Sequence, residues 1–104
     1  MQVNVTDAAE QHRYEARVDG ELAAIAEYIR TPELVVFTHT EVLAGHQGRG
    51  ISSGLVGQAL DDVRRQGLKV LPLCPFVARY MERHAQAYGD LEYRSRTTLT
   101  DVTA

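Results

Sequence analysis

The stretch from residue 35 to residue 55 changes character twice, and it constrains the fold more than any other part of the chain. It begins with β-branched, aromatic and aliphatic residues up to Leu43, which are typical of a strand. Residues 44–50 contain three glycines and no acid, and the apolar spacing becomes helical from Ile51. A strand, a glycine loop and a helix start present backbone N–H groups to an anion. The stretch predicts a phosphate-bearing ligand at residues 47–52, with a plain glycine turn as the alternative.

The composition limits the classes of protein to which the chain can belong. Its 104 residues suit one domain, which we expect at residues 1–94, followed by a polar tail at 95–104. A net charge of −3 argues against a general nucleic-acid binder. No apolar run approaches the roughly 20 residues that span a membrane, and the N-terminus lacks the features of a signal peptide. The single cysteine suits a reducing compartment, so we expect a cytoplasmic protein.

The N-terminal part of the chain predicts antiparallel strands. Residues 13–18 alternate between apolar and charged side chains, a short strand is indicated at residues 3–6, and Asp19-Gly20 is a strong hairpin signal. Residues 21–30 also have a composition that favours helix, but the turn before them favours a strand. The apolar start of the strand at Val35 predicts a central strand that is covered on both faces.

The second half predicts two helices joined by a strand. Apolar residues from Ile51 to Val63 form one helical face, and Gln66-Gly67 ends that helix. A strand at residues 68–73 then implies a parallel crossover. Pro75 opens a second helix whose apolar face extends to Tyr88, and residues 91–94 are a candidate last strand. The expected fold is α/β: a mixed sheet with antiparallel N-terminal strands, a parallel strand-helix-strand crossover and two main helices.

Two common phosphate-binding loops fit the glycine stretch poorly. A Walker loop needs a lysine after its last glycine, but Gly50 is followed by Ile51 and Ser52. A dinucleotide-binding loop needs a third glycine where this chain has Ser53.

A third loop fits better. The run Gln47-Gly48-Arg49-Gly50-Ile51-Ser52 follows a strand and opens a helix, and it resembles the Gln/Arg-x-x-Gly-x-Gly/Ala loop of the GCN5-related N-acetyltransferases, with Ser52 in place of the last Gly or Ala. Further segments resemble a compact, single-domain subgroup of that superfamily: Tyr14-Glu15, Asp19-Gly20, His39-Thr40-Glu41-Val42, Pro72-Leu73-Cys74-Pro75-Phe76-Val77, and Tyr80 with His84 and Tyr88. The resemblance covers about residues 3–93. It implies the compact fold of the GCN5-related N-acetyltransferases (GNAT fold) and the transfer of acetyl from acetyl-CoA to an amine.

The resemblance also implies where coenzyme A would lie. The loop and helix start would hold the pyrophosphate through backbone N–H groups. The backbone of Val42 and Leu43 would pair with the pantetheine amides. Arg79 could meet the 3′-phosphate, although a solvated helix face also explains it.

Four residues are candidates for the chemistry. Cys74 precedes a helix whose dipole favours a thiolate. The resemblance implies a cysteine in the acetyl pocket, where Cys74 would either carry the acetyl group or line the pocket; the alternative is a small buried residue. His39 and Glu41 share one face of a strand, where either could accept a proton from the amine. A core position for His39 and an exposed strand end for Glu41 are the alternatives. The resemblance also makes Tyr80 a candidate acid for the leaving thiolate, with a packing role as the alternative.

An alternative function follows from the small size of the chain. It could bind acetyl-CoA as a sensor or interaction module with little turnover. In either case we expect coenzyme A as partner, an unidentified amine acceptor for an enzyme, no metal, and a monomer or weak dimer.

Overall fold

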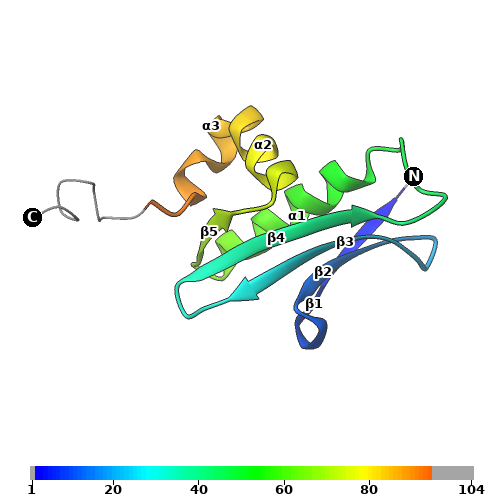
Figure 1. The fold of residues 1–104 in the computed structure, drawn as a ribbon, viewed down its shortest axis with the longest axis horizontal. Coiled ribbons are helices and arrows are strands. Elements are labelled where there is room, and N and C mark those ends of the chain that lie inside the picture. Colours follow the sequence, from blue (N-terminus) through cyan, green and yellow to red (C-terminus); the bar gives the residue numbers. More distant parts are fainter. Residues whose placement is uncertain (1, 95–104) are drawn as a thin grey trace, which may run out of the picture.

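The computed structural model describes residues 2–94, and within them five strands form one sheet (Figure 1). The strands lie in the order of the chain: β1 (Val3–Ala8), β2 (Arg13–Val18), β3 (Glu21–Arg30), β4 (Leu34–Val42) and β5 (Lys69–Pro72). The first four are antiparallel neighbours, whereas β5 runs parallel to β4. The helical elements are α1 (Ile51–Arg65), α2 (Pro75–Arg83), α3 (Ala85–Tyr88) and the 3-10 turns η1 (Ala9–Gln11) and η2 (Gly89–Leu91). The mixed sheet and its parallel crossover confirm the predicted fold class.

The predicted hairpin forms at Asp19 and Gly20. Both residues have positive φ, +51° and +80°, as a two-residue turn that matches the strand twist requires. Val18 and Glu21 then face each other across β2 and β3. The strand predicted at residues 21–30 is confirmed. The turn pairs it with β2, and the side chains of Ala23, Ala24, Ile25 and Ala26 are buried.

Helix α1 has the predicted bounds and the predicted apolar face. Every residue predicted for that face is buried: Ile51, Leu55, Val56, Ala59, Leu60 and Val63. At its end the N–H of Gly67, with φ +75°, donates to Arg64, and the N–H of Leu68 donates to Val63. This is the paired hydrogen-bond pattern of a glycine C-cap, so Gly67 ends the helix as expected.

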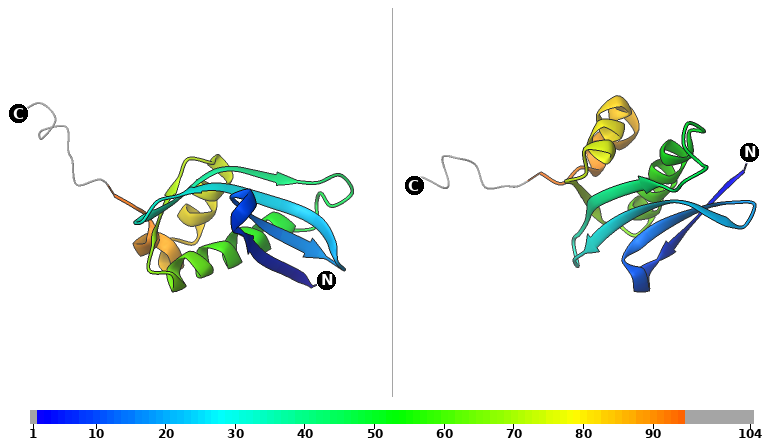
Figure 2. Two further views of the ribbon diagram at one scale, coloured as in Figure 1. Left: turned by 90° about the horizontal axis from the view of Figure 1, so that it is seen from below. Right: turned by 45° about the vertical axis from the view of Figure 1, so that its right-hand side comes forward.

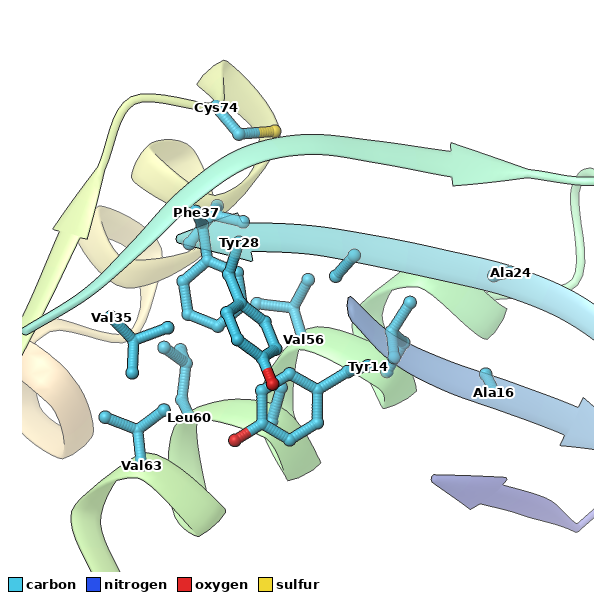
Figure 3. Close-up of a cluster of buried hydrophobic side chains, with 14 of the residues drawn as sticks. Tyr14, Ala16, Ala24, Tyr28, Val35, Phe37, Val56, Leu60, Val63 and Cys74 are labelled. Atoms are coloured by element: carbon cyan, nitrogen blue, oxygen red, sulfur yellow. The ribbon is translucent and has the colours of Figure 1, made fainter. Parts of the chain in front are cut away.

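The core lies between the sheet and α1 (Figure 3). Tyr14, Tyr28 and Phe37 come from three strands, and their rings lie 5.3 to 6.3 Å apart, centroid to centroid. The two tyrosine hydroxyls reach carboxylates at the edge of this cluster, Tyr14 donating to Asp62 at 2.7 Å and Tyr28 to Asp7. The aromatic rings are thereby buried with their polar ends satisfied.

Both main helices lie on the same side of the sheet (Figure 2). The hydroxyl of Tyr88, at the end of α3, donates to Asp61 of α1 at 2.9 Å, which joins α3 directly to α1. Within the described residues, the other face of β4 carries half-buried Val36 and exposed Thr38 and His39. The expectation that β4 would be covered on both faces is therefore wrong, since its apolar start serves a single core.

The second helix is shorter than predicted. It ends at Arg83, and His84, with ψ of 40°, separates it from the single turn of α3. Arg64 of α1 donates to the carbonyl of Ala87 and to Asp90 at 2.9 Å, so contacts with α1 hold this segment.

The predicted last strand is wrong as well. Of residues 91–94, Leu91 ends η2, and one isolated bridge joins Glu92 to Val70. The predicted polar tail at residues 95–104 lies outside the described part of the chain. In the described part, no helix is both long and apolar enough to cross a membrane.

Candidate active site

Strands β4 and β5 diverge after Phe37, which is paired with Pro72. Proline has no N–H to continue the ladder. The N–H groups of Leu73 and Cys74 both donate to the carbonyl of Phe37, at 3.0 and 2.9 Å, and the chain then enters α2. β4 continues to Val42, so its last residues border a gap that β5 does not fill.

The backbone direction of β4 decides which residues face this gap. The N–H of Leu43 donates to Ala23 of β3 at 2.8 Å, and its carbonyl accepts from His46 at 3.1 Å. In an antiparallel pair the bonding direction alternates, so the backbone groups of Thr40 and Val42 point away from β3. The backbone role expected for Val42 is therefore open to it, whereas both backbone groups of Leu43 are already used within the protein.

Cys74 lies at this gap, directly before α2 (Figure 3). It is buried, with 4% of its surface exposed, and its Sγ is 3.4 Å from Oγ1 of Thr40. Burial raises the pKa of the thiol, but hydrogen bonds from the Thr40 hydroxyl and from backbone groups of Val77, Phe76 and Thr40 outweigh it and lower the pKa below its usual value. Thr40 and the start of α2 thus supply hydrogen bonds that favour the thiolate form of Cys74.

His39 and Glu41 lie together on the face of β4 opposite the helices. Their cross-strand partners are Glu27 and Ile25 of β3, and His39 Nε2 is 3.2 Å from Glu41 Oε1. Both side chains are about half exposed, at 54% and 52%. The core position considered for His39 is therefore excluded, and the pair is accessible from the open side of the sheet.

The glycine loop leads from the end of β4 to an uncapped helix. Gly48 and Gly50 have φ of +77° and +73°, a region that favours glycine. Gly54 makes the first helical bond, to Gly50, so the N–H groups of residues 51–53 have no partner within the helix. Gly50 supplies no side-chain cap, and the first turn has no acid. The positive end of the α1 dipole is thus left uncompensated.

The side chains of this loop play unequal parts. The amide oxygen of Gln47 accepts from the N–H of Gly45 at 3.1 Å and so holds the loop itself. Ile51 is buried in the core, which leaves only its backbone N–H for a ligand. Arg49 is exposed and Ser52 is half-buried, so these two remain the loop side chains that a ligand could reach.

Tyr80 lies against α1. A Cβ built on Gly57 would be 2.7 Å from its hydroxyl oxygen, so the absence of a side chain at Gly57 makes room for the phenol. Its ring packs on His84 with centroids 4.3 Å apart. Burial, followed by the charge of Asp61, raises the pKa of Tyr80, which keeps the hydroxyl protonated near neutral pH.

A pocket of about 240 Å³ lies between the start of α1 and one face of α2. It is lined by Ser53, Phe76, Arg79, Tyr80, Arg83 and His84. The two arginines and the first turn of α1 make it a basic cavity that suits an anion. Arg79, a predicted ligand contact, is therefore close to the helix start. Ser53 escaped the sequence analysis because contacts between α1 and α2 leave no trace in local spacing.

Thr40 is a second residue whose part could not be read locally. It was noted within a motif, but its contact with Cys74 joins positions that are far apart in the chain. No group of three His, Cys, Asp or Glu residues in the described part is placed to hold a metal ion.

Comparisons with known proteins agree with this geometry. The family model described as GCN5-related N-acetyl-transferase matches residues 13–91. A sequence comparison with curated proteins gives no significant match.

Solved structures share the fold at low sequence identity. A GCN5-like protein from Staphylococcus aureus is 18% identical with a TM-score of 0.60, and the match covers 92% of this chain and 93% of that one. A ribosomal-protein-alanine N-acetyltransferase from Brucella melitensis biovar Abortus 2308 is 22% identical, with a TM-score of 0.55 and coverage of 83% and 64%. The diaminobutyrate acetyltransferase EctA from Paenibacillus lautus, solved with its substrate and coenzyme A, is 16% identical, with a TM-score of 0.55 and coverage of 78% and 54%.

This chain thus spans less than two thirds of the length of the Brucella and Paenibacillus enzymes and nearly all of the Staphylococcus protein. The family model covers most of the chain, from the start of β2 to the end of η2. The chain belongs to the GCN5-related N-acetyl-transferase family.

Proposed function

We propose that the protein is an acetyl-CoA-dependent N-acetyltransferase that acts on an amine. One observation carries the proposal. The uncapped start of α1 follows the end of β4, and the last residues of β4 border the gap at which Cys74 lies. A diphosphate site and a strand edge that can pair with amide groups are thereby joined by one short loop, which suits an elongated cofactor whose diphosphate is followed by an amide-bearing arm that ends in a thioester.

Coenzyme A would bind along this line. Its diphosphate would accept hydrogen bonds from the N–H groups of residues 51–53 and from Arg49 and Ser52. Arg79 would meet the 3′-phosphate from the basic pocket between the helices. The pantetheine amides would pair with the backbone of Val42, and the thioester would then reach the gap next to Thr40 and Cys74.

The acceptor amine would approach from the open face of the sheet. An ammonium group must lose a proton before it attacks, and the pair of His39 and Glu41 on that face would take it. The neutral nitrogen then attacks the thioester carbonyl, an N–C bond forms and the C–S bond breaks. Tyr80 would return a proton to the leaving thiolate, since its raised pKa keeps the hydroxyl protonated. Much of the rate would come from positioning the two reactants.

Cys74 would take part in one of two ways. In direct transfer it lines the acetyl pocket. In a two-step route its thiolate attacks the thioester first, releases coenzyme A and passes the acetyl group to the amine. The lowered pKa of Cys74 is compatible with the second route, and intact mass after incubation with acetyl-CoA alone separates the two.

The solved structures support an amine as the acceptor class. The Brucella enzyme is named for a ribosomal-protein alanine, and the Paenibacillus enzyme was solved with L-2,4-diaminobutyric acid. The buried free thiol of Cys74 supports the cytoplasm as the proposed location. A monomer or weak dimer is proposed for the assembly.

Two measurements test the proposal. Coenzyme A should raise the melting temperature more than NAD or ATP at the same concentration, and equal shifts would sink the proposed cofactor. Release of coenzyme A from acetyl-CoA is then followed with a panel of amines. Binding without release above background in wild type would favour an acetyl-CoA-binding module instead. His39→Ala should keep the binding and lose the release, and in the two-step route Cys74→Ala should do the same.

A further inference from the structure

His46 is buried in a loop whose other residues are exposed. Only 8% of its surface is accessible, whereas Gly45, Gln47 and Gly48 on either side are open to solvent. A histidine between glycines in a surface turn would normally extend into water. Its burial therefore requires specific contacts.

Those contacts join the loop to two strands. Nε2 of His46 is 3.0 Å from Oε1 of Glu21, the first residue of β3 after the hairpin turn. The N–H of His46 donates to the carbonyl of Leu43, and Leu43 in turn donates to Ala23 of β3. The loop is thus attached to β3 through a side chain as well as through the backbone at the end of β4.

The second ring nitrogen reduces what this arrangement contributes to stability. A carboxylate only accepts hydrogen bonds, so Nε2 is the donor to Glu21. Nδ1 is then buried, and among the described residues it has no partner. An unsatisfied buried polar atom costs free energy. Glu21 is 72% exposed, so its bond to His46 is a weak compensation.

We propose that His46 is a positioning residue that holds the glycine loop in the conformation that accepts the diphosphate of coenzyme A, an inference that rests on the proposed function. The loop contains Gly45, Gly48 and Gly50, each with positive φ. Glycine loses more backbone entropy on ordering than any other residue. A loop that is ordered before the ligand arrives does not subtract that entropy from binding. His46 contributes this order from inside the loop, without occupying the N–H groups of residues 51–53.

The role makes a distinct kinetic prediction. His46 touches neither the thioester gap nor the pair of His39 and Glu41 in the contacts described above. Its loss should weaken coenzyme A binding and leave the chemical step unchanged once acetyl-CoA is saturating. A residue needed only for folding would lower the melting temperature without separating the two constants.

The test compares four variants in the full chain. His46→Ala should raise the Kd for coenzyme A and the KM for acetyl-CoA about tenfold, which is about 1.4 kcal/mol, with kcat within about twofold of wild type. His46→Gln, whose amide can still donate to Glu21, should recover most of the affinity. Glu21→Ala removes the partner at an exposed site and should weaken binding about threefold. Glu33→Ala, an exposed carboxylate in the turn before β4, is the matched control and should match wild type.

Amide hydrogen exchange in the ligand-free protein gives a readout that does not depend on coenzyme A. Residues 44–50 should exchange faster in His46→Ala and Glu21→Ala than in the control. Unchanged exchange in His46→Ala, unchanged Kd in that variant, or a loss of kcat at unchanged Kd would each overturn the role of His46. Failure of wild type to bind coenzyme A would overturn the proposed function and the inference with it, whereas a wild type that binds and a His46→Ala variant that binds equally well would overturn only the inference.

Discussion

Sγ of Cys74 and Oγ1 of Thr40 lie 3.4 Å apart, and this contact joins the residue before α2 to the end of β4, which β5 does not cover. The hydroxyl is one of several donors that offset the burial of the thiol. The same pair of residues borders the gap proposed for the thioester, so its chemistry can be tested separately from that of the anion loop.

Thr40→Val should raise the pKa of Cys74, because valine keeps the shape but removes one hydrogen bond that favours the thiolate. The single cysteine allows thiolate absorbance to report this ionisation directly. Thr38→Val, on an exposed residue of the same strand, should leave the midpoint unchanged. The lowered pKa of Cys74 also makes stability depend on pH. The folded protein holds the Cys74 proton less tightly than the unfolded chain, so the stabilisation is present above the pKa of the unfolded chain and is lost as pH falls through the pKa of the folded protein.

Substitution by alanine should have different effects on stability at two glycines of α1. At Gly54 the nearest atoms to a new Cβ belong to Val3 at 4.0 Å, so Gly54→Ala should stabilise the protein by about 0.5–1 kcal/mol through helix propensity. At Gly57 the new methyl would displace the hydroxyl of Tyr80. Gly57→Ala should therefore show no such gain in urea unfolding and should lower kcat about tenfold.

Tyr80→Phe should lower kcat as well, and the effects of Tyr80→Phe and Gly57→Ala on kcat should not add. Additive losses would argue that Tyr80 and Gly57 act separately.

Arg79→Ala should remove the preference of the protein for coenzyme A over dephospho-coenzyme A. If the guanidinium meets the 3′-phosphate, affinity for coenzyme A falls about tenfold and affinity for the dephospho form stays the same. Isothermal titration with both ligands measures this difference. Arg65→Ala, at the far end of α1 and paired with Asp62, is the control. An equal loss for both ligands would place the arginine elsewhere in the site.

His39→Gln and Glu41→Gln should each lower kcat about a hundredfold, the usual scale for loss of a proton acceptor. Since Nε2 of His39 is 3.2 Å from Oε1 of Glu41, the two act as one unit, and the double variant should be little worse than either single one. Steady-state kinetics with a fixed amine tests this. Both side chains are half exposed, so the melting temperature should hardly change. A large drop in melting temperature would indicate a structural role instead.

Alkaline pH should weaken the fold through Tyr28. Burial and the hydrogen bond to Asp7 raise its pKa to about 12. The folded protein then holds this proton more tightly than the unfolded chain, so the contribution is complete below about pH 10 and is lost as pH rises toward 12. Tyr28→Phe should flatten this part of the stability curve at a cost of about 1 kcal/mol. Urea unfolding at several alkaline pH values gives both quantities, and a curve as steep as that of wild type would contradict the assignment.

Local patterns predicted the elements whose ends are set by backbone chemistry. Asp19-Gly20 adopts positive φ at both positions and closes the hairpin, and Gly67 caps α1, because few other residues tolerate that geometry. The alternation in β2 and the helical spacing after Gly50 were also read correctly. These features depend on neighbours within a few residues, which a sequence displays.

The predictions that failed depend on contacts between distant segments. The second helix is interrupted at His84, and the segment after it is held by hydrogen bonds from Arg64 of α1 to Ala87 and Asp90. Strand register is a similar long-range effect: it directs the N–H of Leu43 to Ala23 of β3, while the pairing of Leu43 with pantetheine stays a prediction. A shift of one position along a strand reverses the bonding direction, and apolar composition alone does not reveal it.

By itself the sequence determined the order of strands and helices, the glycine loop with its uncapped helix, and the family to which the chain belongs. Only the tertiary structure decided that Thr40 meets Cys74, that Gly57 receives Tyr80, and that His46 is buried against Glu21. The reason is physical. Propensity and periodicity act over one or two turns of chain, whereas these contacts form when the sheet register and the packing of two helices bring residues from separate elements together.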